Sequence, residues 1–87
     1  MYASILRGDR ERATGDLEPL WKQVTEQPGL VVAYVLANAE DTQDGIVLSI
    51  WESEEAFNAY ATTDLRALVE TVGALDRTNY YVLRATI

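Results

Sequence analysis

The sequence has no cysteine and no histidine among its 87 residues. Without cysteine the chain can form no disulfide, zinc-thiolate or iron–sulfur site, and without histidine it lacks the commonest metal ligand and general base. Basic residues are also few, since seven Lys and Arg stand against fourteen Asp and Glu and give a net charge of −7. Such a surface repels phosphate backbones and anionic lipid, so we expect no nucleic acid and no membrane as partners. We also expect no metal, because the carboxylates Glu52, Glu54 and Glu55 at a helix start point different ways and serve the helix dipole.

Long apolar runs are absent too. The longest run, Leu30 to Ala37, has eight residues, whereas a membrane helix needs roughly twenty. The first fifteen residues carry charge from Arg7 onward and lack the apolar core and small-residue cleavage site of a signal peptide. We therefore expect a soluble cytoplasmic protein, and the short length predicts one domain over residues 1–87.

Hydrophobic periodicity predicts six segments of regular structure. The second predicted helix begins after the N-cap Ser53, and its apolar stripe keeps one phase from Phe57 to Val72. That stripe is compatible with one long helix or with two collinear helices and a kink at Thr62-Thr63. The predicted segments are strands at 1–7, 30–37, 46–51 and 78–87, and helices that begin near residues 17 and 54.

The order of these segments is strand, helix, strand, strand, helix, strand. This βαββαβ order is typical of the ferredoxin-like α+β fold, in which an antiparallel four-stranded sheet carries two helices on one face. The opposite face of such a sheet meets water in a monomer and should then carry polar residues at alternate positions.

The two middle strands break this rule. Residues 30–37 are apolar throughout, and residues 46–51 are apolar except at Ser49, so both faces of this hairpin are apolar. About six such side chains at ~1.5 kcal/mol each give on the order of 9 kcal/mol per chain. Two chains gain about twice that, against an association cost of roughly 4 to 15 kcal/mol. We therefore expect a homodimer closed through the sheets. The alternative is a monomer that covers this face with its own loop at Arg10 and its tail.

The stretch Trp51-Glu52-Ser53-Glu54-Glu55-Ala56-Phe57 resembles the antibiotic biosynthesis monooxygenase family, a branch of the dimeric α+β barrel superfamily. The resemblance extends to the element order of nearly the whole chain, including the turn Gln27-Pro28-Gly29 before the second strand. It implies a small homodimer, a dimeric α+β barrel, with a ligand pocket between helices and sheet. Some members oxidise polycyclic phenols with molecular oxygen and no metal or flavin, so no cofactor is implied.

Two positions depart from the pattern of the anthrone-oxidising members. The resemblance implies an asparagine four residues before the tryptophan and a tyrosine six residues after it, where this chain has Val47 and Phe57. Neither side chain can donate a hydrogen bond to a substrate oxygen. The haem-degrading members need a histidine early in the second helix, and this chain has none, so haem catalysis is not expected.

The candidate ligand-binding residues surround the end of the third strand. Trp51 offers a large apolar ring with one N–H donor, although a tryptophan that joins sheet to helix would fit the position equally well. Ser49 shares its face by strand alternation, but without histidine it is a poor nucleophile. Tyr60 lies one turn beyond Phe57, where it either enters the pocket or reaches water. The predicted set is Val47, Ser49, Trp51, Phe57 and Tyr60, with no catalytic residue assigned.

Together these patterns predict a homodimer that binds a small apolar or aromatic molecule between helices and sheet. If the protein is an enzyme, cofactor-independent oxidation of a phenol is the expected reaction. The alternative is a non-catalytic dimer that binds a ligand or another protein. An enzyme needs a polar group beside Trp51 that can stabilise a phenolate, whereas the pocket of a carrier can be wholly apolar. Arg84, expected in the middle of the last strand, could bind an anionic group or pair across the interface.

Overall fold

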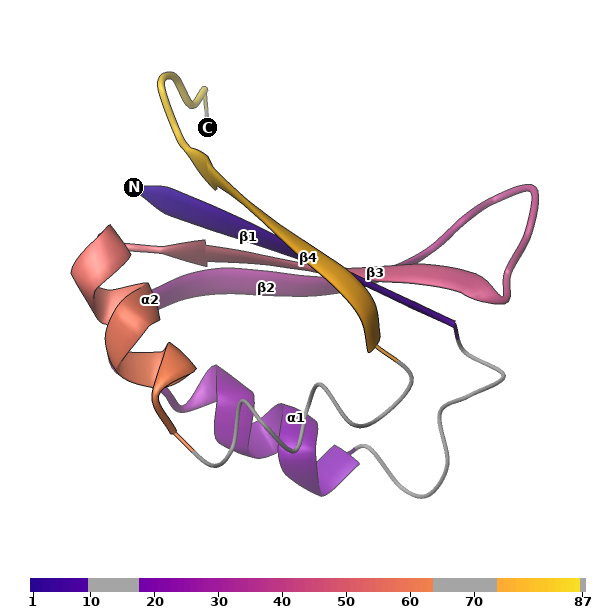
Figure 1. Cartoon of the computed structure of the whole chain (residues 1–87), viewed down its shortest axis with the longest axis horizontal. Helices are drawn as coiled ribbons and strands as arrows, with labels where there is room; N and C mark the ends of the chain where they lie inside the picture. Colours follow the sequence, from indigo (N-terminus) through magenta and orange to yellow (C-terminus); the bar gives the residue numbers. More distant parts are fainter. Residues whose placement is uncertain (10–17, 64–73, 87) are drawn as a thin grey trace.

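The computed structural model describes residues 1–9, 18–63 and 74–86. Within them the chain forms a four-stranded antiparallel sheet in the order β2-β3-β1-β4. Both helices lie on the same side of this sheet (Figure 1). The ferredoxin-like α+β fold is thereby confirmed. The elements are β1 (Tyr2–Asp9), α1 (Glu18–Thr25), β2 (Leu30–Ala37), β3 (Asp44–Trp51), α2 (Glu54–Ala61) and β4 (Ala74–Tyr81).

Strand alternation divides the sheet into two faces. On β1, Tyr2, Ser4 and Leu6 are buried on the face that carries the helices. Their partners on β3 across the sheet are Trp51, Ser49 and Val47 respectively. The outer face has Ile5 opposite Leu48, and Leu48 in turn opposite Tyr34.

Two local features place α2 against the sheet. Ser53 caps the helix, because its Oγ accepts a hydrogen bond from the backbone N–H of Ala56 at 3.1 Å. Gly29 adopts a φ of 84°, and a Cβ atom there would lie 2.5 Å from the Cβ of Ala56. The Gly29 carbonyl also accepts a hydrogen bond from the Glu52 N–H at 2.8 Å. The turn before β2 and the start of α2 therefore touch so closely that only glycine fits.

Several predicted boundaries were wrong, among them the start of the third strand, which lies at Asp44 and not at residue 46. Gly8 and Asp9 continue β1, because they pair with Gly45 and Asp44, and the ion pair of Arg7 with Asp44 at 3.1 Å secures this end. Antiparallel pairing with β3 extends the strand past residue 7, its predicted end.

The second helix ends earlier than its apolar stripe predicted. α2 stops at Ala61 with Thr62 as its C-cap, so a single continuous helix through Thr62-Thr63 is wrong. Each of the two threonine hydroxyls donates to a carbonyl three residues earlier, and such side-chain bonds compete with continued helix. The alternative, two collinear helices whose apolar stripe runs on to Val72, falls in part on residues 64–73, which lie outside the described residues.

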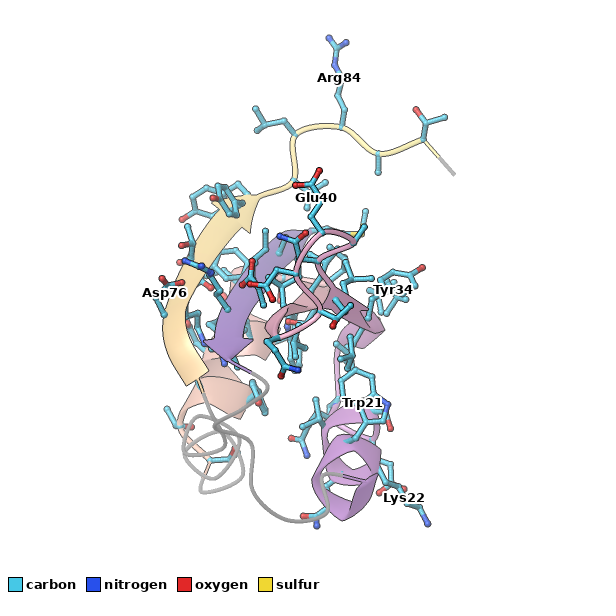
Figure 2. All side chains as sticks on the ribbon, turned by 90° about the vertical axis from the view of Figure 1, so that its right-hand side faces the viewer. Trp21, Lys22, Tyr34, Glu40, Asp76 and Arg84 are labelled. Atoms are coloured by element: carbon cyan, nitrogen blue, oxygen red, sulfur yellow. The ribbon has the colours of Figure 1, made fainter. Side chains whose placement is uncertain are left out.

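The last strand spans Ala74–Tyr81 and not residues 78–87. Tyr81 pairs with Tyr2, and the Val82 N–H donates to the Met1 carbonyl, after which β1 offers no further partner. Residues 82–86 leave the sheet, and Arg84 projects from this tail, outside any strand (Figure 2). The position of Arg84 in mid-strand was therefore also wrong.

Neither described helix has the length and apolar character needed to cross a membrane. In the same residues, no three His, Cys, Asp or Glu side chains gather in a way that could hold a metal ion.

Candidate functional site

An aromatic cluster lies between α2 and the helix-covered face of the sheet. Trp51, at the end of β3, is fully buried, and Tyr2, Phe57 and Tyr60 are nearly so. The Trp51 indole stacks on Tyr60 with ring centroids 5.0 Å apart and meets Phe57 edge-on at 5.8 Å. These are the offset and edge-to-face arrangements that aromatic rings favour.

The spacing of the helix residues explains this arrangement. Phe57 and Tyr60 are three residues apart, so they lie on the same side of α2 and both reach the sheet. Tyr2 joins the cluster from β1 through Phe57, with centroids 5.3 Å apart. Next to it, Tyr81 on β4 contacts the ring of Tyr2 edge-on at 5.5 Å.

A chain of polar contacts runs beneath the rings across three strands. The Trp51 Nε1–H donates to Ser49 Oγ at 3.0 Å, and Ser49 Oγ lies 3.4 Å from the Ser4 carbonyl oxygen, to which it donates. Arg77 Nη1 then donates to Ser4 Oγ at 2.6 Å. Both serines are buried, so these bonds satisfy polar groups that would otherwise be costly to bury.

Arg77 brings a positive charge to the cluster. Its guanidinium carbon lies 5.4 Å from the centroid of the Phe57 ring, which is within the range of a cation–π interaction. The charge therefore sits beside the aromatic side chain at the position where the resemblance implied a tyrosine. The cluster is therefore not wholly apolar.

At the outer end of the cluster, Tyr81 is 66% exposed and its hydroxyl donates to Glu54 Oε2 at 3.0 Å. This bond, together with the negative charge of Glu54, raises the pKa of the Tyr81 phenol, because the carboxylate stabilises the protonated form. Glu54 is thus more than a helix-terminal carboxylate.

Four of the five predicted ligand-binding residues come together here, namely Ser49, Trp51, Phe57 and Tyr60. The fifth, Val47, lies on the same face of β3, two residues before Ser49, and pairs with Leu6 on β1 and Val35 on β2. Two roles were considered for Trp51, a pocket-lining residue and a core tryptophan between sheet and helix, and in the structure its N–H donates to Ser49 Oγ.

Sequence reasoning missed three contributors to the cluster. Tyr2 and Ser4 could have been found from the alternation of the first strand, since Ser4, like Ser49, is a lone hydroxyl in an apolar run. Arg77 carries no such signal, because its place depends on the register between the first and last strands.

Comparison with known proteins agrees with this fold. The model of the family described as antibiotic biosynthesis monooxygenase matches residues 5–68, well over half of the chain. No curated protein matches the sequence.

Solved structures align over almost the whole chain at low identity. SnoaB, a cofactor-independent oxygenase from Streptomyces nogalater, gives a TM-score of 0.74 at 12% identity and covers 97% of this chain and 94% of its own. Rv0793 from Mycobacterium tuberculosis gives 0.73 at 16% identity, with coverage of 99% and 98%. A mutant of MhuD with two manganese protoporphyrin IX molecules bound per active site gives 0.64 at 16% identity, with coverage of 99% and 98%. At such identities the likeness concerns the fold, and the family model carries the assignment: this chain belongs to the antibiotic biosynthesis monooxygenase family.

Proposed function

We propose that the protein is a cytoplasmic homodimer that binds a small, flat aromatic molecule beside Trp51 and, as a cofactor-independent monooxygenase, oxidises a phenol there. The observation that carries this proposal is the position of Arg77, whose charge lies against the aromatic cluster. A cation favours the ionised form of a phenol.

The polar chain supports a role for Arg77 in the reaction. In a cofactor-free oxidation the phenolate is the electron-rich species that reacts with oxygen, so a lower phenol pKa raises its population. Val47 and Phe57 cannot supply a hydrogen bond, and the Trp51 N–H is already donated to Ser49. The guanidinium of Arg77 carries a positive charge that can stabilise the phenolate through its field.

The test uses a polycyclic phenol whose absorbance reports ionisation. We expect the pKa of the bound phenol to be lower in the parent than in Arg77→Met by about 1 unit or more. Oxygen uptake, measured with an electrode, should fall in the same variant, and Arg77→Lys should retain part of both effects. Equal phenol pKa values in parent and Arg77→Met would remove Arg77 from the mechanism.

Binding without oxygen uptake would indicate the second candidate, a non-catalytic carrier. The observation in its favour is that Val47 and Phe57 stand where the oxidising members have hydrogen-bonding residues. A carrier should show a thermal shift with the phenol in parent protein and no oxygen consumption above buffer.

The outer face of the sheet supports the dimer. Tyr34 is 51% and Leu36 42% exposed, and Figure 2 shows Tyr34 projecting away from the body of the chain. Large exposed apolar patches mark interaction surfaces, and a second copy would cover this one symmetrically. Leu83, beyond the end of β4, is also 91% exposed. The register places these side chains on the outer face: Ile5, Val32, Tyr34, Leu36, Ile46, Leu48, Ile50 and Tyr80.

Sedimentation equilibrium tests this arrangement. Leu48→Glu places a charge in the middle of the outer face without touching the aromatic cluster, and we expect it to yield monomers. Gln23→Glu, the same charge change on the exposed side of α1, should leave the dimer intact. A parent protein that sediments as a monomer at micromolar concentration would contradict the proposal.

A further inference from the structure

Aromatic rings form an unbroken series of contacts from the interior of the protein to its surface. The series begins at Trp51, which has no exposed surface, and passes through Phe57 and Tyr2 to Tyr81. Successive ring centroids are 5.8, 5.3 and 5.5 Å apart. Trp51 and Tyr2 also lie directly opposite each other in the paired strands β3 and β1. At such separations an electron can pass from ring to ring.

The two ends of this series differ in how they handle a proton. The Trp51 N–H is hydrogen-bonded to the Ser49 hydroxyl, a very weak base, so an oxidised Trp51 keeps its proton and remains a radical cation. The Tyr81 hydroxyl instead donates to the Glu54 carboxylate at 3.0 Å, and a carboxylate readily accepts the proton of an oxidised phenol. A tyrosine that loses its proton is easier to oxidise. The oxidised state therefore moves from Trp51 to Tyr81, while the electron moves from Tyr81 to Trp51.

We propose that the rings of Trp51, Phe57, Tyr2 and Tyr81 conduct a one-electron oxidation from the protein interior to the surface, with Glu54 as the terminal proton acceptor. The initiating oxidant is an organic peroxyl radical, formed when a substrate radical escapes and combines with molecular oxygen. That source rests on the proposed function, whereas the conduit itself does not. Its role is to protect the site by moving the oxidising equivalent to an exposed phenol.

The steps balance. The peroxyl radical takes one electron from Trp51 and becomes a peroxide anion, which leaves the indole as a radical cation. One electron then moves from Tyr81 to Trp51 through Tyr2 and Phe57, while the Tyr81 hydroxyl proton moves to Glu54. The products are neutral Trp51, a Tyr81 phenoxyl radical and a protonated Glu54 carboxyl group.

Laser photo-ionisation tests the conduit without any phenol ligand. The full chain with Trp21→Phe retains Trp51 as its single tryptophan, and light at the red edge of indole absorption ionises it without exciting tyrosine. Dissolved oxygen takes up the ejected electron as superoxide. We expect the tryptophan radical absorbance to decay at the rate at which the tyrosyl radical absorbance grows, and this rate should not change on dilution.

The variants locate the end of the path. In the Trp21→Phe background, Tyr81→Phe should slow the decay of the tryptophan radical at least about tenfold, and Glu54→Gln should do the same because it removes the proton acceptor. Tyr34→Phe, an exposed tyrosine on the outer face, is the matched control and should leave both rates unchanged. Circular dichroism spectra that match those of the parent will show that these single-atom changes leave the fold intact.

Two results would overturn the proposal. One is a tyrosyl signal that grows at the parent rate in Tyr81→Phe and is lost in Tyr60→Phe, which would end the path inside the cluster. The other is a Trp51 radical that decays in the parent without any tyrosyl signal. Neither result depends on whether the protein oxidises phenols, so failure of the conduit and failure of the proposed function can be told apart.

Discussion

Replacement of Ser49 by alanine tests the polar chain beneath the aromatic cluster. The change removes the acceptor of the Trp51 N–H and the donor to the Ser4 carbonyl, in a place that water does not reach. A buried donor left without a partner costs about 1–3 kcal/mol. In a domain of this size that loss lowers the melting temperature by about 4–8 °C for each kcal/mol.

A double-mutant cycle separates this cost from a general loss of packing. Trp51→Phe removes the N–H, so Ser49→Ala in that background no longer leaves a donor unpaired. We expect Ser49→Ala to lower the free energy of unfolding by about 1 kcal/mol less in the Trp51→Phe background than in the parent. This difference is within the usual range for directly contacting residues. Urea unfolding at one fixed protein concentration measures all four free energies, since dimer stability depends on concentration. Equal costs in both backgrounds, within about 0.3 kcal/mol, would refute the reasoning.

Three further outcomes follow from local geometry. Ser53→Ala should destabilise the fold by about 1 kcal/mol in urea unfolding, because the cap of α2 is lost, and Ser53→Asp should not. Gly29→Ala should cost more than about 2 kcal/mol, from its positive φ and the contact with Ala56, and additional replacement of Ala56 by Gly should recover part of that loss. Because Glu54 raises the pKa of Tyr81, their bond stabilises the fold below the ordinary tyrosine pKa and is lost as pH rises through the folded value. Spectrophotometric titration of Glu54→Gln should therefore show this phenol ionising at lower pH, and an unchanged titration would contradict the assigned bond.

The features that the sequence predicted well are those set by nearby residues. The length of the apolar run defined β2 to the residue, and the Ser53 cap with its following carboxylates defined the start of α2. The same local spacing brought Phe57 and Tyr60 to Trp51. Each of these depends on contacts within one element or between neighbours in the chain.

The features that it missed depend on pairing between distant segments. β4 ends at Tyr81 because β1 begins at Tyr2, which the composition of residues 78–87 does not reveal. The same register brings Arg77 to Ser4, 73 residues away in the chain, and so decides the charge of the candidate site. A prediction that began the last strand at residue 78 had no reason to consider Arg77.

The most direct test of the account is the fluorescence of Trp51 in the Trp21→Phe chain during titration with a polycyclic phenol. We predict saturable quenching of Trp51 emission, which stops at one ligand per site. Emission that stays constant, at phenol concentrations that raise the melting temperature of the protein, would place the ligand elsewhere and contradict the account.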